Sequence, residues 1–301
     1  MKVGFIGLGL MGKWMAKNIL SGGHQLLIND IDPNAGEELS QMGAIWKDTP
    51  AKVAAGSDIV FTSLPNPESV ISVALGENGI LNGINTGSSY YDLSTTDPNT
   101  MKEISDKASF KKAFVFDAPV SGGTNGAKDG SLCIMVGGDE TEFEKHKPIL
   151  ELMGNEIIYC GDIGSGATCK IVNNLIGMTL NVVLSEALSI GVKGGVPVLK
   201  LYETISKSTG DTFIMHTFIN GLFARNFNPG FKLSLGAKDI GLATKLAESL
   251  EVPTEVSKII QERFLKALER GWGEESTHAV AKLQEELNQH TYQFFDRIFS
   301  L

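Results

Sequence analysis

The chain has 301 residues, which is long for one hydrophobic core and suits two domains. Its 42% hydrophobic and 20% charged content is that of an ordinary globular protein and argues against disorder. The 35 acidic and 26 basic residues give a net charge of −9 without a basic stripe, which argues against nucleic acid or an anionic membrane surface as the partner.

The sequence also argues against insertion into a membrane or export. The most apolar stretch, residues 167–194, contains charged and amide side chains such as Lys170 and Asn174, so we expect no transmembrane helix. A strand-like run begins at Lys2, which leads us to expect no signal peptide.

The metal-binding residue types are dispersed. Cys133, Cys160 and Cys169 are odd in number and lack CxxC spacing, so we interpret them as free thiols in a reducing cytoplasm. The histidines also show no ligand spacing, and we expect no metal site. They are His24, His146, His216, His278 and His290.

Short β-rich runs alternate with helical patterns through the first half of the chain. We predict strands at residues 3–6, 25–29, 59–62, 90–92, 115–118, 132–136 and 157–159, and helices at 11–20, 35–42, 68–75, 99–108 and 140–153. This alternation predicts an α/β Rossmann-type doubly wound domain, with a mostly parallel sheet and helices on both faces.

The alternation of strand and helix patterns stops after the glycine-rich loop at residues 161–166. No further strand is indicated, and helical patterns separated by Gly and Pro continue to the end. We therefore predict a dinucleotide-binding domain at 1–162 and an all-α C-terminal domain at 163–301, which begins with a long helix at 167–194.

A glycine-rich turn follows the first predicted strand and opens the first helix. The GxGxxG pattern is weak alone, but this context is the one that dinucleotide binding requires. The first glycine permits the tight turn, the second lets a pyrophosphate approach, and the third lets helix and strand pack closely. The residues expected to bind the cofactor here are Gly7, Leu8, Gly9, Leu10, Met11 and Gly12.

The second strand ends in Asn29 and Asp30, about 20 residues beyond the glycines, where an acidic residue accepts the adenosine ribose hydroxyls. A plain turn residue is the alternative for Asp30. Its carboxylate would repel the 2′-phosphate of NADP, and no Arg or Lys follows before Lys47. We expect NAD rather than NADP as the cofactor.

The predicted strand at 115–118 runs into Ser121, Gly122 and Gly123. Ligands of doubly wound sheets bind beyond the carboxyl ends of the strands, and the N–H groups of such a turn can hold an anion beside the serine hydroxyl. A plain surface turn is the alternative, and we interpret the nearby Asn125-Gly126 and Asp129-Gly130 in that way.

Lys170 lies in the apolar helix predicted at 167–194, where an ammonium is costly unless it is paired or its charge is used. Asn174 follows one turn later, at i+4, on the same face. A lysine that extends its head to solvent is the alternative interpretation.

Four stretches resemble one known family, the 3-hydroxyisobutyrate dehydrogenase-like β-hydroxyacid dehydrogenases, which include tartronate semialdehyde and succinic semialdehyde reductases. They are GFIGLGLMG at 4–12, DAPVSGG at 117–123, GSGATCKIVNN at 164–174 and KDIGLA at 238–243. The resemblance covers nearly the whole chain. It implies a small anionic hydroxyacid or semialdehyde as substrate, and a homodimer or homotetramer.

The resemblance also implies residue roles. Lys170 matches the catalytic lysine, which exchanges a proton with the substrate oxygen while hydride passes to or from the nicotinamide. Asn174 matches the substrate-holding asparagine, and Ser121, Gly122 and Gly123 match the loop that grips the substrate carboxylate. The positions that match cofactor contacts are Leu64, Pro65, Asn66, Thr95 and Lys238. Without the resemblance, Lys238 and Asp239 could be interpreted as a solvent-exposed pair on a helix.

Three other functions remain as alternatives. Imine reductases look similar but generally lack the lysine, and 6-phosphogluconate-type enzymes are usually longer and need basic residues for a sugar phosphate. A non-catalytic dinucleotide-binding scaffold would have lost the lysine. Retention of Lys170, Asn174 and Ser121 favours the hydroxyacid dehydrogenase.

Overall fold

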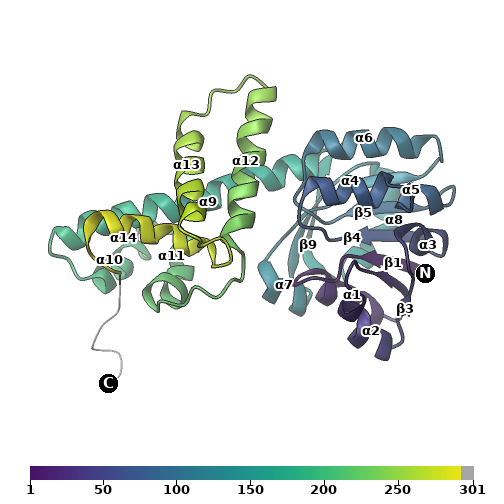
Figure 1. The fold of residues 1–301 in the computed structure, drawn as a ribbon, viewed down its shortest axis with the longest axis horizontal. Helices are drawn as coiled ribbons and strands as arrows, with labels where there is room; N and C mark the ends of the chain where they lie inside the picture. Colours follow the sequence, from purple (N-terminus) through teal and green to yellow (C-terminus); the bar gives the residue numbers. More distant parts are fainter. Residues whose placement is uncertain (293–301) are drawn as a thin grey trace. The chain divides into compact units, whose positions relative to one another are not determined.

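A computed structural model describes residues 1–292, and packing divides it into two compact units that meet at Ile171 and Val172 (Figure 1). The division falls inside one long helix, α9 (Ser165–Lys193), which starts in the first unit and continues in the second. The domain boundary drawn after residue 162 from the sequence stays a prediction.

The first unit is built on a nine-stranded sheet with the order β3-β2-β1-β4-β5-β6-β8-β7, in which β9 also pairs with β8. Strands β1 to β6 run parallel to one another, β8 runs antiparallel to β6 and β7, and β9 runs parallel to β8. The strands are β1 (Lys2–Ile6), β2 (Gln25–Asn29), β3 (Ile45–Trp46), β4 (Ile59–Thr62), β5 (Ser89–Asp92), β6 (Phe114–Asp117), β7 (Val120–Ser121), β8 (Leu132–Gly137) and β9 (Gly154–Gly161). The doubly wound prediction is confirmed.

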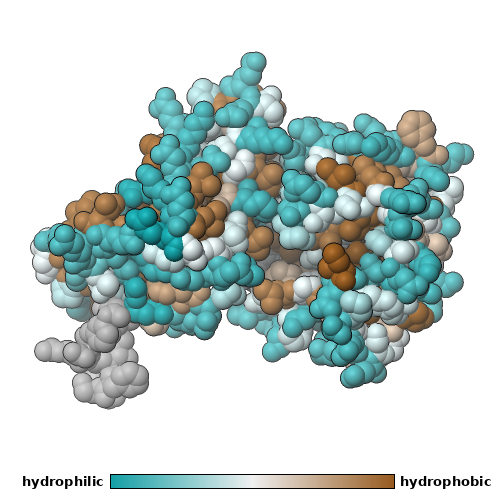
Figure 2. Space-filling model, in the orientation of Figure 1, coloured by the Kyte–Doolittle hydropathy of each residue, from teal (hydrophilic) through white to brown (hydrophobic). Residues whose placement is uncertain are grey.

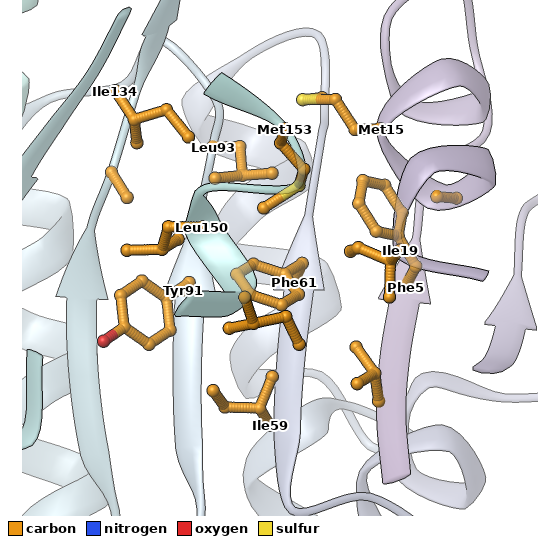
Figure 3. Close-up of a cluster of buried hydrophobic side chains, with 14 of the residues drawn as sticks. Phe5, Met15, Ile19, Ile59, Phe61, Tyr91, Leu93, Ile134, Leu150 and Met153 are labelled. Atoms are coloured by element: carbon orange, nitrogen blue, oxygen red, sulfur yellow. The ribbon is translucent and has the colours of Figure 1, made fainter. Parts of the chain in front are cut away.

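Helices cover both faces of this sheet, so the central strands are apolar on both sides. One face carries a ladder of rings from Phe5 through Phe61 to Tyr91, packed beneath Met15 and Ile19 of the first helix (Figure 3). The helices of the unit are α1 (Gly12–Ser21), α2 (Glu37–Gln41), α3 (Pro50–Ala55), α4 (Pro67–Leu75), α5 (Ile80–Gly83), α6 (Pro98–Ser109), α7 (Gly123–Asp129) and α8 (Glu140–Leu150).

Several of these helices begin with the same two-residue signal. Thr49, Asn66 and Asp97 each cap a helix with a side-chain oxygen, and a proline follows at the first helical position. Such a cap satisfies an unpaired N–H group, and proline there needs no donor. The starts of α3, α4 and α6 are therefore determined locally.

The structure corrects the interpretation of Asn125-Gly126 as a surface turn, because both residues lie inside α7. Gly126 is buried, and a Cβ atom built on it would lie 3.1 Å from the Leu132 side chain. Asp129 ends the helix, and Gly130 provides its left-handed C-cap. The residues interpreted as surface turns therefore form the body and the C-terminal end of α7, which packs against Leu132 of β8.

The second unit is helical over its described residues, with one isolated bridge between Lys232 and Ser276. Its elements are α9, α10 (Val198–Ile205), α11 (Phe213–Phe218) with a π turn (Ile219–Phe223), α12 (Leu233–Ser249), α13 (Glu255–Glu269), a 3-10 turn (Thr277–Ala281) and α14 (Lys282–Asn288). Met178 of α9 contributes to one core cluster and Leu188 to another, so α9 is the central helix of this unit.

The sequence-based expectation that no segment is long and apolar enough to span a bilayer was wrong. Helix α9 is long and apolar enough to cross a membrane, the one helix within residues 1–292 with that property. Its few polar interruptions do not lower the mean hydropathy below that of a spanning segment. The core helix of a soluble protein passes the same test, and α9 fills two cores.

Exposed apolar side chains follow one stripe of α9: Val172, Ile176, Val183 and Ile190. Their spacing of four, seven and seven residues keeps them on one side of the helix. On the face shown in Figure 2, apolar side chains gather at the end of the second unit where Figure 1 labels α10 and α14.

The sequence ends in a run rich in apolar residues from Tyr292 to Leu301, and the structure describes this run only at Tyr292. This residue is buried, and its hydroxyl donates to the Ser185 carbonyl at 2.6 Å. Phe294, Phe295, Ile298, Phe299 and Leu301 lie outside the described residues.

Candidate active site

The glycine-rich turn joins β1 to α1 with the geometry expected for a dinucleotide. Gly7 has a φ of +90°, and a Cβ atom there would lie 2.4 Å from the Ser63 carbonyl oxygen. A Cβ atom on Gly12 would lie 1.9 Å from the Gly7 carbonyl oxygen, whereas one on Gly9 would meet nothing within 4 Å. The turn is therefore tight at its first and third glycines and open at its second, where a pyrophosphate would approach.

The predicted ribose-binding carboxylate is fixed beside this turn. Asp30 accepts hydrogen bonds from the Leu8 N–H at 2.6 Å and from the Asp32 N–H at 2.9 Å. Asn29 is buried and donates to the Lys47 carbonyl at 2.7 Å. Asn29 therefore has a structural role at the strand end, while Asp30 is held near the open turn.

A second loop lies after the neighbouring strand β4. The Leu64 N–H donates to the Ser94 hydroxyl at 2.8 Å, and that hydroxyl donates to the buried Asp92 carboxylate at 2.6 Å. Asn66 caps α4 by accepting from the Ser69 N–H at 2.8 Å. Pro65 lies between these two fixed residues, and Thr95 follows β5 at the same edge of the sheet.

The predicted carboxylate-gripping loop is part of the sheet at its start. Ser121 ends β7 and is half-buried opposite Cys133 of β8. Gly122 and Gly123 both have positive φ, +132° and +64°, which favours glycine. Both glycines are exposed, next to the half-buried Ser121.

Lys170 is buried, with 7% of its surface exposed. Burial and then the Glu156 carboxylate raise the pKa of the Cys133 thiol, whereas the charge of Lys170 lowers it. Lys170 therefore lies near Cys133, the residue opposite Ser121. Within the first unit, the structure brings the candidate catalytic lysine and the candidate substrate loop to the same stretch of β8.

Asn174 and Lys238 are joined through one carboxylate in the second unit. The Asn174 amide donates to Asp239 Oδ2 at 2.6 Å, and Lys238 Nζ lies 3.0 Å from Asp239 Oδ1. Asp239 is only 1% exposed, so the idea of a solvated Lys238–Asp239 pair is wrong. A buried carboxylate fixes both polar residues.

Sequence reasoning missed three buried carboxylates that organise the predicted site: Asp92, Asp117 and Asp239. The available signal was their position, because Asp92 and Asp117 end apolar strands. Within the described residues, no group of three or more His, Cys, Asp and Glu side chains could hold a metal ion.

Comparison with known families matches both halves of the chain. The model described as the NAD binding domain of 6-phosphogluconate dehydrogenase matches residues 2–161. The model described as NAD-binding of NADP-dependent 3-hydroxyisobutyrate dehydrogenase matches residues 164–284.

Curated relatives are similar over nearly their full length. The chain is 37% identical to 2-hydroxy-3-oxopropionate reductase of Escherichia coli (strain K12), over 96% of this chain and 99% of that one. It is 38% identical to 2-(hydroxymethyl)glutarate dehydrogenase of Eubacterium barkeri, over 95% of each. A solved structure of Mycobacterium tuberculosis 3-hydroxyisobutyrate dehydrogenase with L-serine has a TM-score of 0.88 and 28% identity, over 94% of this chain and 98% of that one.

Proposed function

The chain belongs to the 3-hydroxyisobutyrate dehydrogenase-like family of β-hydroxyacid dehydrogenases, and on that premise we propose its cofactor, its proton donor and its class of substrate. It is an oxidoreductase that transfers hydride between a pyridine nucleotide and the hydroxyl- or carbonyl-bearing carbon of a small hydroxyacid. Its family membership extends over both units, so the activity is that of the whole chain.

NAD(H) is the proposed cofactor. The open space at Gly9 and the N-terminus of α1 suit a pyrophosphate, and Asp30 suits two ribose hydroxyls. A 2′-phosphate would meet the Asp30 carboxylate and no basic side chain between residues 31 and 46. The family model for the second unit is described for an NADP-dependent enzyme, which makes the cofactor a primary question for experiment.

Lys170 is the proposed general acid and base. When bound, the nicotinamide supplies or accepts the hydride. Lys170 donates a proton to the substrate oxygen during reduction and accepts one during oxidation. The observation that carries this assignment is the burial of Lys170 near Cys133, the residue that pairs with Ser121 of the proposed substrate loop.

A single carboxylate is the proposed handle of the substrate. The Ser121 hydroxyl and the N–H groups of Gly122 and Gly123 provide donors for one anionic group. No arginine lies in segment 208–213 of the second unit, and its Asp211 carboxylate lies 2.8 Å from His216 Nε2. A relative named for a glutarate, a dicarboxylate, makes a second charged group the main alternative.

A homodimer or homotetramer is the proposed assembly. The support is the exposed apolar stripe of α9, since exposed apolar side chains that share one face of a helix suit burial against another subunit. Its place of action is proposed to be the cytoplasm, supported by three free thiols.

One assay tests the cofactor and the substrate together. The purified chain is incubated with 3-hydroxyisobutyrate, 2-hydroxy-3-oxopropionate and 2-(hydroxymethyl)glutarate, each with NAD(H) and NADP(H), and absorbance of the reduced nicotinamide is followed. We expect turnover of a monoanion and a higher kcat/KM with the non-phosphorylated cofactor. A preference for NADP(H) would overturn the cofactor proposal, and faster turnover of the dicarboxylate would overturn the charge proposal.

A pair of variants tests the role of Asp30. Asp30→Asn should lower the ratio of kcat/KM with NAD(H) to kcat/KM with NADP(H), whereas Asp32→Asn, which keeps Asp30 in place, should leave this ratio nearly unchanged.

A further inference from the structure

Two buried carboxylates end neighbouring strands of the first unit. Asp92 of β5 and Asp117 of β6 are partners in the parallel register and are 0% and 1% exposed. Burying two acidic side chains side by side is costly unless hydrogen bonds compensate. Their hydrogen bonds therefore indicate what each carboxylate is retained for.

Asp117 binds the start of α9. Its Oδ1 accepts from the Gly164 N–H at 2.6 Å, and its Oδ2 accepts from the Ala167 N–H at 2.5 Å. These N–H groups belong to the N-terminal end of the helix, where backbone donors have no partner within the helix and a negative charge is favourable. A strand residue far away in sequence thus caps α9.

The start of α9 also has no room to shift. A Cβ atom on Gly166 would lie 2.2 Å from the Met135 carbonyl oxygen and 2.8 Å from the Asp117 carbonyl oxygen. Lys170 follows Ala167 within one helical turn. The two Asp117 bonds and the close packing at Gly166 therefore fix the axial position and rotation of the turn that carries Lys170.

Asp92 makes the corresponding bonds on the cofactor side. Its Oδ1 accepts from the Thr62 and Ser94 hydroxyls, each at 2.6 Å. Ser94 in turn accepts from the Leu64 N–H in the loop proposed to contact the dinucleotide. The neighbouring carboxylates thus hold two different parts of the predicted site.

We propose that Asp117 is a positioning residue, whose carboxylate holds the first turn of α9 so that the Lys170 ammonium can exchange a proton with the substrate. Asp92 is its counterpart for the cofactor loop. The inference rests on the proposed role of Lys170. It adds a residue that contacts neither substrate nor cofactor but on which the rate of proton transfer depends.

The Asp117 carboxyl has a pKa near neutrality, so its proposed role can be tested by changing the pH. Burial raises its pKa to about 7, the Gly164 and Ala167 N–H groups lower it, and Asp92 of β5 raises it. On β9, burial first and then neighbouring charges, that of Asp117 among them, raise the pKa of the Cys160 thiol. The carboxylate that anchors α9 is therefore protonated, and its bonds to α9 weakened, as the pH falls below neutrality.

The test compares two matched variants, Asp117→Asn and Asp92→Asn, in the full chain. Each keeps the shape of its side chain and removes its charge. We expect Asp117→Asn to lower kcat about 10–100-fold, because small displacements of a catalytic group have effects of this size. Its Kd for NADH should stay within about twofold of the wild type, whereas Asp92→Asn should mainly weaken NADH binding.

The pH profile separates positioning from stability. If Asp117 positions Lys170, the apparent pKa in the kcat profile shifts in Asp117→Asn; simple destabilisation would lower the amount of active enzyme at an unchanged apparent pKa. An unshifted profile with wild-type kcat would overturn the inference. Lys170→Met distinguishes this failure from a wrong function: if that variant is inactive and Asp117→Asn is normal, only the positioning role fails.

A measurement on the unaltered protein covers the case in which Asp117→Asn does not fold. The amide protons of Gly164 and Ala167 are followed by NMR as the pH is changed. We expect both to titrate with one midpoint that coincides with an acid limb in kcat. A kcat that is constant across that midpoint contradicts the inference.

Discussion

Lys170 is the residue whose replacement separates chemistry from structure most directly. In Lys170→Met the apolar stem remains and the ammonium is lost, so kcat should fall about 10²–10⁴-fold. The free energy of unfolding is measured beside the rate, so that a loss of chemistry is separated from a loss of the fold. Steady-state rates measure kcat, NADH titration measures cofactor binding, and urea unfolding measures the free energy of unfolding.

Lys193 provides the matched control for that variant. It lies on the same helix and is exposed, so Lys193→Met should leave kcat unchanged. If Lys170→Met folds, binds NADH and turns over near the wild-type rate, Lys170 is not the proton-transfer group.

Asp117 gives a pH dependence of stability. Its pKa rises from 3.8 to about 7 on folding, so the folded state holds this proton more tightly than the unfolded state. The resulting stability is fully present below pH 3.8 and is lost as the pH rises through about 7. The loss is at most about 4 kcal/mol.

Urea unfolding at pH 5 and pH 8 measures this effect. The free energy of unfolding should fall more between these pH values in the wild type than in Asp117→Asn, which has no proton to lose. Equal differences in the two proteins would show that Asp117 ionises in the folded state as it does in the unfolded one.

At the residue scale, the sequence alone identified site residues whose chemical type differs from that of the surrounding pattern or that lie at a characteristic spacing from a motif. Lys170 stands out in an apolar helix, and Asp30 stands at a fixed distance from the glycines. The roles of Asp117 and Asp239 could not be assigned in this way, although the position of Asp117 at a strand end was a signal. Their partners are backbone N–H groups or amides that are distant in sequence and close only in the fold.

At the scale of elements, the glycine-rich turn offers a matched pair of variants. Gly12→Ala places a methyl group 1.9 Å from the Gly7 carbonyl oxygen, so it should destabilise the fold by about 1–3 kcal/mol. Gly9→Ala meets no atom within 4 Å and should leave the free energy of unfolding nearly unchanged. It fills the space proposed for the pyrophosphate, so NADH affinity should fall about tenfold or more.

Thermal unfolding and NADH titration measure this pair. Equal loss of stability in both variants would mean that Gly9 is as tightly packed as Gly12. Unchanged NADH affinity in Gly9→Ala would place the pyrophosphate elsewhere.

Element prediction succeeded for long apolar patterns and missed short elements. The patterns allowed α4, α6 and all strands of four or more residues to be predicted, whereas α3 was missed although Thr49 and a proline cap it locally. The two-residue strands β3 and β7 exist only because a neighbouring strand pairs with them. Helix α7 was missed because its glycines, which usually mark turns, are required here by burial of Gly126.

At the scale of the whole molecule, the α9 stripe predicts self-association. Light scattering at micromolar concentration should give the mass of a dimer or tetramer. Val183→Glu places a charge within the stripe and should shift the population toward monomer. Phe110→Glu changes an equally apolar residue, 88% exposed in the first unit, and should leave the mass unchanged. A monomeric wild type would contradict the prediction.

The shared helix α9 has a consequence for recombination between relatives. A chimaera joined after residue 162, where the sequence changes character, would take Asp117 from one parent and Lys170 from the other. Hydrogen bonds from Gly164 and Ala167 would then cross the parental junction. A crossover after Ile171 inherits the anchor, the helix start and the lysine together, and it exchanges the second unit as a packing module. A chimaera made to change the substrate preference should therefore be joined within α9 rather than in the loop before it.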